Sequence, residues 1–281
     1  MWFKISSDVI DFIASVTYTN TIDALELTVK QIMSNYTPPY RLMVTGGVDS
    51  QTMLLAWKWF GKNYIPTSVR YNTYLNSHDL ETLNVFSARE NMEVQYLDFD
   101  LLDFYNNEYF KLAEIYKITS PHFGAHLGMT ENLNGTIIFS GDRLSSTRAM
   151  IGYNNICLYN ASLQRSIVPY FLLQTPEIAY SKIYEFSKNP SSECYNTTDE
   201  YSKKIISLHY MGIPVIPQTT KYTGFEKVKD LYDQYSYKIS NKTRLKYSNK
   251  SSKRPYDLLL RYPLEEKFGC SHFKYNINKI S

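Results

Sequence analysis

The 281-residue sequence predicts an α/β fold in which a parallel sheet is flanked by helices. Residues 40–44, 65–71 and 94–99 have the length and the β-branched or aromatic content of buried strands. Stretches of helical periodicity, residues 49–61 and 79–93, separate these three segments. Strands that alternate with helices at this spacing are typical of βαβ units, whose strands run parallel.

A helix is also predicted before the first strand, over residues 24–33. Its apolar residues fall on one face of a helix: Leu25, Val29, Ile32 and Met33. Either Thr21 or Asp23 is suited to cap its first turn. The helix must end before the Pro38-Pro39 pair, because proline cannot continue a helix.

The remaining elements divide the chain into two regions. The α/β core, with its N-terminal extension, occupies residues 1–150, and residues 151–281 form a mostly helical region. Within the first region we expect helices at residues 101–118 and 121–127 and a strand at residues 136–140. In the second region we expect helices at residues 163–170, 175–187 and 201–210, followed by an extended link at residues 212–217.

The turn after the first strand has the composition of an anion-binding loop. It reads Thr45-Gly46-Gly47-Val48-Asp49-Ser50, and a helix is predicted to start at Asp49 or Ser50. The N-terminus of a helix presents unpaired N–H groups and the positive end of the helix dipole. Two glycines allow the backbone to approach a phosphate, and the Ser50 hydroxyl and Asp49 carboxylate add a donor and a magnesium ligand.

This loop resembles the Ser-Gly-Gly-x-Asp-Ser loop of the PP-loop ATP pyrophosphatases, with Thr45 in place of the first serine. That superfamily includes the synthetase domain of asparagine synthetase, GMP synthetase, 7-cyano-7-deazaguanine synthase and the tRNA lysidine and thiolation enzymes. The resemblance implies a Rossmann-like sheet of the HUP type that binds ATP and Mg²⁺ at the carboxyl ends of its strands. An ordinary strand-turn-helix connection with two glycines is the alternative interpretation.

The resemblance also implies roles for single residues. The backbone N–H groups of Gly46, Gly47 and Val48, with the Thr45 and Ser50 hydroxyls, would hold pyrophosphate. The ends of the first two strands, at Val44 and Arg70, would face the adenine, and Asp49 would hold magnesium.

A second loop is predicted at the same edge of the sheet. Ser140-Gly141-Asp142 follows the apolar strand at residues 136–140. It resembles the Ser-Gly-acidic segment of asparagine synthetases, where acidic residues meet magnesium pyrophosphate, so Asp142 is the second candidate metal ligand. Arg143 and Leu144 replace the further acidic residues of that segment, and a simple Gly-Asp turn remains the alternative.

Positive charge is concentrated near the C-terminus. The formal net charge is +3, yet residues 221–281 contain 14 Lys and Arg against 6 Asp and Glu. The resembled enzymes use a C-terminal Lys or Arg to neutralise the charge that develops on the phosphates, and Lys221, Arg254 and Arg261 are the candidates. Each of them is also consistent with a solvated surface charge, and the basic region as a whole is consistent with RNA binding.

Other functional classes are disfavoured by the sequence. Cys157, Cys194 and Cys270 are far apart, which argues against a disulfide framework, a zinc cluster and the cysteine pairs of thiolation enzymes. His122 and His126 share a helix face, but a core or cleft position is favoured over a metal site. The chain shows no signal peptide and no apolar run approaching ~20 residues, so we expect a cytoplasmic protein without a membrane span.

The leading functional hypothesis is an ATP-dependent adenylating enzyme that resembles asparagine synthetase. Such an enzyme converts ATP to AMP and pyrophosphate and activates a carboxylate or similar oxygen for attack by ammonia or an amine. Trp2 stands where a nucleophilic cysteine would begin an N-terminal glutaminase. An RNA modifier of the lysidine type and a non-catalytic nucleotide-binding sensor remain alternatives.

Overall fold

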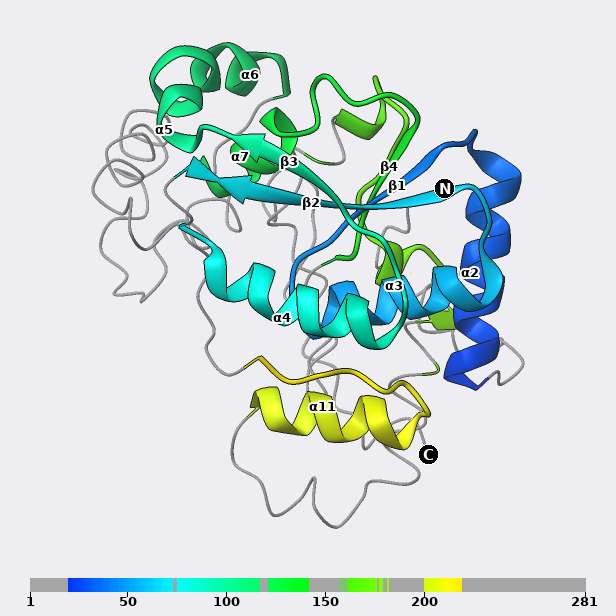
Figure 1. Ribbon diagram of the computed structural model, residues 1–281. Helices are drawn as coiled ribbons and strands as arrows, with labels where there is room; N and C mark the ends of the chain where they lie inside the picture. Colours follow the sequence, from blue (N-terminus) through cyan, green and yellow to red (C-terminus); the bar gives the residue numbers. More distant parts are fainter. Residues whose placement is uncertain are drawn as a thin grey trace, which may run out of the picture.

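The computed structural model contains a five-stranded, all-parallel sheet with helices on both faces, a Rossmann-like α/β arrangement (Figure 1). The strand order is β3-β2-β1-β4-β5. The chain therefore forms β2 and β3 on one side of β1, and then crosses over to form β4 and β5 on the other side. The structure describes residues 20–72, 75–116, 121–141, 158, 161–175, 177–178, 181 and 200–218.

All five strands are short, and their bounds confirm the predicted alternation of strands and helices. The strands are β1 (Tyr40–Met43), β2 (Tyr64–Tyr71), β3 (Gln95–Phe99), β4 (Thr136–Phe139) and β5 (Ile167–Val168). β1 pairs with β2 on one side and β4 on the other, with Tyr40 opposite both Tyr64 and Thr136. This in-register start brings the carboxyl ends of β1 and β4 to the same level.

The described helices surround this sheet. They are α2 (Thr21–Asn35), α3 (Val48–Phe60), α4 (Ser77–Arg89), α5 (Leu101–Asp103), α6 (Tyr109–Tyr116), α7 (Pro121–Gly128) and α11 (Glu200–Tyr210). In Figure 1, α3 and α4 lie on one side of the sheet with α11 beyond them, and α5 to α7 lie on the other side. The α/β fold class is therefore confirmed for the described residues, whereas most of the predicted helical region after residue 150 lies outside them.

Alternate residues of the central strands point into two separate cores. Leu42 and Ile138 belong to the first core, with residues of α2, α3, α4 and the segment after α11. Met43 and Phe139 belong to the second core, with aromatic residues of the α5–α7 region. A strand buried on both faces must be apolar at successive positions, which explains why β4 reads Thr-Ile-Ile-Phe.

One sequence prediction was wrong. Residues 163–170 were predicted to be helical, but Ile167 and Val168 form β5, which pairs in parallel with Ile137 and Ile138 of β4. Both residues are fully buried, one in each core. A two-residue strand is too short to show alternation in the sequence, so only its pairing with β4 identifies it.

Several predicted boundaries also shift. The cap of α2 is Asn20, whose side chain accepts a hydrogen bond from the Asp23 backbone N–H, in place of Thr21 or Asp23. α4 begins at Ser77, two residues earlier than predicted. The helix predicted over residues 101–118 contains a π-helical turn at Phe104–Glu108 between α5 and α6. None of the helices in the described part of the chain has both the length and the apolar character needed to cross a membrane.

Candidate functional site

The predicted anion loop joins β1 to α3. After β1, the Val44 N–H still donates to the Thr67 carbonyl at 2.9 Å, so the chain leaves the sheet only at Thr45. The helix begins at Val48, one residue before the predicted start, and Gly47 occupies the N-cap position. Gly47 has no side chain to cap the helix, which leaves the first turn of α3 suited to an anion.

The loop lies at the topological switch point of the sheet. Chain connections lead from β1 toward β2 and β3 on one side, and β4 and β5 extend the sheet on the other. In open α/β sheets, ligands bind outside the carboxyl ends of the strands at this point. The loops after β1 and β4 meet here, with the Ser50 and Ser140 hydroxyl oxygens 3.5 Å apart. Ser140 and Gly141 therefore occupy the predicted edge of the sheet.

Hydroxyl groups hold the loop in its curved shape. The Thr45 N–H donates to the Ser50 Oγ at 3.2 Å, and the Gly47 N–H donates to the Thr45 Oγ1, also at 3.2 Å. The Thr45 and Ser50 hydroxyl oxygens are 3.4 Å apart. Since Thr45 Oγ1 accepts from the Gly47 N–H, it occupies the position that a phosphate oxygen would take on that group.

Asp49 is ion-paired with a lysine from a distant part of the chain. The Lys204 Nζ lies 2.5 Å from the Asp49 Oδ2, and both side chains are about four-fifths buried, with 19% and 22% exposed. Lys204 belongs to α11, and its sequence gives no sign of this contact, because Lys203 and Lys204 are adjacent and have the same local environment in the sequence. The amphipathic pattern of α11 could have suggested a buried face, but it could not indicate that this face meets Asp49.

Gly46 is tightly enclosed by neighbouring segments. A methyl group on Gly46 would lie 2.5 Å from the Asp79 carbonyl oxygen, 2.8 Å from the Thr82 Cβ and 3.0 Å from the Gln218 Nε2. Asp79 and Thr82 belong to the first two turns of α4. A glycine is therefore required at this position by packing, independently of any ligand.

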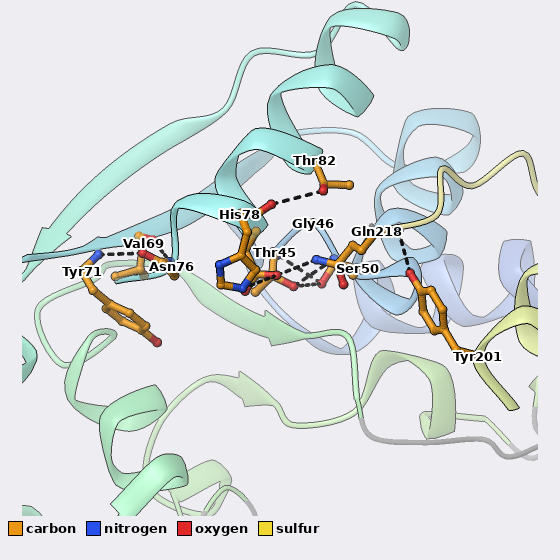
Figure 2. A network of polar contacts seen from close by, with 12 residues as sticks. Thr45, Gly46, Ser50, Val69, Tyr71, Asn76, His78, Thr82, Tyr201 and Gln218 are labelled. Atoms are coloured by element: carbon orange, nitrogen blue, oxygen red, sulfur yellow. Dashed lines mark hydrogen bonds and ion pairs between the residues drawn. The ribbon is translucent and has the colours of Figure 1, made fainter. Parts of the chain in front are cut away.

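A polar network connects α4 with the segment after α11 (Figure 2). The Gln218 Nε2 donates to the Asp79 Oδ1 at 2.5 Å, and the Gln218 N–H donates to the Tyr201 hydroxyl at 2.8 Å. The His78 Nε2 is 3.9 Å from the same Asp79 oxygen. Figure 2 shows Gly46 beside this network, so the network fixes the elements that enclose the loop.

Asn76 fixes the start of α4. Its Oδ1 accepts from the Tyr71 N–H at 3.1 Å, and its Nδ2 donates to the Val69 carbonyl at 2.8 Å. Burial, reinforced by the charge of Asp79, raises the pKa of the Tyr71 phenol well above its usual value of 10.0. Tyr71 is packed into the second core.

The other described candidates, Arg70 and Gly141, contact residues outside the loop. Arg70 makes a two-pronged ion pair with Asp98 of β3, at 2.9 and 3.0 Å. Gly141 has a positive φ of 109° and lies beside Tyr170, which explains the glycine at this turn. The remaining candidates lie outside the described residues: Asp142, Lys221, Arg254 and Arg261.

Within the described ranges, no group of three or more His, Cys, Asp or Glu side chains could hold a metal ion by itself. His126 is half-buried and stacks on Phe139, with ring centroids 6.2 Å apart. A magnesium ion bound with a nucleotide needs only one or two carboxylates, because phosphates and water supply the other ligands. Asp49 is the carboxylate on the first turn of α3 at this loop, and its Oδ2 is paired with Lys204.

No protein-family model matches this chain, and no curated protein matches it either. The Rossmann-like arrangement is shared by proteins of many unrelated functions, so the fold alone does not identify a reaction. Any function must therefore be inferred from the residues around the loop.

Proposed function

We propose that the protein is an ATP-dependent adenylating enzyme that splits ATP between the α- and β-phosphates. The observation that carries this proposal is the loop at residues 45–50, which lies at the topological switch point with Asp49 and Lys204 facing each other. Loop N–H groups and hydroxyls can donate hydrogen bonds to the oxygens of a pyrophosphate, and the positive ammonium group of Lys204 can neutralise part of its negative charge. Transfer of the adenylyl group from ATP depends mainly on positioning of the reactants and on neutralisation of the phosphate charge.

The proposed pyrophosphate contacts come from the loop at residues 45–50. Gly46 and Gly47 lead into the first turn of α3, which begins at Val48, and the Thr45 and Ser50 hydroxyls accept hydrogen bonds from the N–H groups of Gly47 and Thr45. On binding, a phosphate oxygen would replace Thr45 Oγ1 as the acceptor of the Gly47 N–H. The Thr45 hydroxyl would then be able to donate to the same phosphate.

Lys204 would neutralise the charge that develops on the phosphates, a role for which three C-terminal cations were candidates from the sequence. Its ammonium group is already placed at the loop, 2.5 Å from Asp49, and it can move to a phosphate oxygen when one arrives. Lys221, Arg254 and Arg261 remain proposed as further contacts to ATP. The adenine contacts at Val44 and Arg70 also remain proposals, and Arg70 would have to share its guanidinium group with Asp98.

Asp49, together with Asp142, would hold magnesium. The Asp49 carboxylate is a candidate for this role because it lies on the first turn of α3, at the loop. When bound, magnesium would neutralise charge on the pyrophosphate. Lys204 competes for the same carboxylate oxygen, so metal binding should favour its release toward the phosphates.

The acceptor that receives the adenylyl group is proposed to be a carboxylate or a similar oxygen, later attacked by ammonia or an amine. An RNA modifier would use the basic C-terminal region to hold phosphates. The Lys204–Asp49 ion pair favours a second candidate, a non-catalytic nucleotide sensor, because a lysine can balance the carboxylate without a metal ion.

The experiment that tests the proposal measures pyrophosphate and AMP release from ATP and magnesium, screened against amino acids, other carboxylates and tRNA. We expect Asp49→Ala and Lys204→Met each to lower turnover by about 100-fold or more. Lys203→Met is the matched control, since it removes the same charge from the same helix and should retain turnover.

The outcomes separate the candidates. Full turnover by Asp49→Ala would refute the proposed role of this carboxylate. ATP binding without turnover on any acceptor would support the sensor. Turnover that requires tRNA, with RNA retention that falls steeply as salt rises, would support the RNA modifier.

A further inference from the structure

Gln51 is a fully buried polar side chain in the first turn of α3. Its Nε2 donates two hydrogen bonds, both of 2.8 Å, to the carbonyls of Gly46 and Ile216. Its Oε1 accepts from the Ile216 N–H at 2.6 Å. The amide group therefore pairs with both backbone groups of Ile216 and also reaches the loop.

The contact with Gly46 orients the peptide group that follows. In a trans peptide, the carbonyl of one residue and the N–H of the next point in opposite directions. Because Gln51 holds the Gly46 carbonyl toward itself, the Gly47 N–H must point away from Gln51. That N–H is one of the proposed pyrophosphate donors, and in this structure it donates to Thr45 Oγ1.

The contact with Ile216 anchors the segment that carries Lys204. After α11 the chain turns back, and the Ile213 N–H donates to the Leu208 carbonyl at 2.8 Å. The His209 Nε2 lies 2.7 Å from the Val215 carbonyl, which joins the returning segment to the last turn of α11. A shift of Ile216 would therefore be transmitted to α11 and to Lys204.

We infer that Gln51 is a positioning residue that sets the Gly47 N–H and the Lys204 ammonium group relative to one another. The inference rests on the proposed function, since it assigns both groups to one pyrophosphate. Gln51 acts through the Gly46 peptide and the returning segment after α11, to both of which its side chain is hydrogen-bonded.

The first test uses inorganic pyrophosphate binding to the full chain. Gln51→Glu keeps the acceptor for Ile216 but places carboxylate oxygens against two carbonyls, and Gln51→Met removes all three hydrogen bonds at similar volume. Each should weaken pyrophosphate binding by about tenfold. Thr136→Val is the matched control, because it removes the hydrogen bonds of a buried side chain to Thr37 and Ser166 at the amino ends of the strands and should leave the affinity unchanged.

The second test needs no ligand. A double-mutant cycle of Asp49→Asn and Lys204→Met, followed by urea denaturation, measures the coupling between these residues as a change of about two- to fivefold in the unfolding equilibrium constant. We expect this coupling to disappear when residue 51 is Met or Glu and to persist in Thr136→Val. A merely structural role of Gln51 would lower stability without altering the coupling.

These two tests distinguish the inference from the proposed function. If the wild-type chain fails to bind pyrophosphate, the proposed function fails, and the ligand-free cycle still decides whether Gln51 positions Lys204. Coupling that survives in both Gln51 variants would overturn the inference, as would pyrophosphate affinities equal to that of Thr136→Val.

Discussion

At the scale of single residues, the two glycines of the loop have different reasons to be glycine. Gly46 is enclosed by the backbone of Asp79 and by Thr82, so even one carbon atom has no space. Gly47 is the N-cap of α3, and within the described residues a methyl group there would meet the Thr45 hydroxyl alone, at 3.3 Å. The sequence motif does not distinguish the two glycines, whereas the packing leaves no space for a side chain at Gly46 and leaves more space at Gly47.

We therefore predict that Gly46→Ala lowers the free energy of unfolding by about 1–3 kcal/mol, because a backbone carbonyl cannot move aside as a side chain can. Gly47→Ala should cost less than about 1 kcal/mol, since it only exchanges one permitted N-cap residue for a weaker one. Urea denaturation of both variants checks this difference. Equal losses would show that the enclosure of Gly46 has no energetic consequence.

At the scale of elements, an ion pair between Lys58 of α3 and Glu90 joins α3 to the connection after α4. The Lys58 Nζ donates to both the side chain and the backbone carbonyl of Glu90, at 2.9 and 2.8 Å. The Arg89 Nε donates to the other carboxylate oxygen at 2.8 Å. Burial alone would raise the pKa of the Glu90 carboxyl, but the hydrogen bonds and charges of Lys58 and Arg89 outweigh it and lower the pKa below its usual value of 4.5.

A carboxyl group whose pKa is lowered by folding contributes stability above its unfolded pKa, and this contribution is lost as the pH falls through the folded pKa. Glu90→Gln should therefore be less stable than wild type by about 0.5–1 kcal/mol at neutral pH. The difference should begin to decrease as the pH falls below 4.5 and should disappear once the pH is below the lowered pKa of Glu90. Urea denaturation across this pH range measures it, with Glu93→Gln, an exposed carboxylate on the same connection, as the control. A pH-independent difference would contradict the assigned cause.

At the scale of the whole molecule, the sheet order determines which substitutions matter most. β1 and β4 are central and carry the two loops of the site, whereas β3 is an edge strand of the described sheet. Ile138 of β4 is fully buried in the first core, and Leu97 of β3 is half-buried. Stability should therefore depend more strongly on the strands that support the site.

Ile138→Ala and Leu97→Ala remove the same number of carbon atoms from the centre and the edge. We predict that Ile138→Ala lowers the free energy of unfolding by about 2–5 kcal/mol, because a cavity is left in a close-packed core. Leu97→Ala should cost roughly half as much, since less apolar surface is lost. Chemical denaturation of the two variants compares them, and equal losses would contradict the central placement of β4.

Much of the fold could be predicted from local patterns. The strands β1 to β4 and the helices α2 to α4 have periodicities and terminating residues that require no knowledge of distant contacts. β5 could not be predicted, because two residues carry no period and their identity as a strand depends on pairing with β4. The π-helical turn was missed because it breaks no apolar pattern.

The sequence by itself determined the loop at residues 45–50, its place between a strand and a helix, and the parallel arrangement around it, because each depends on residues that are neighbours in the chain. Only the tertiary structure decided that Lys204 faces Asp49, that α4 encloses Gly46 and that Gln51 joins the loop to Ile216. Lys204 is 155 positions from Asp49 and Ile216 is 165 positions from Gln51. Contacts over such separations depend on how helices pack against the sheet, which no local pattern specifies.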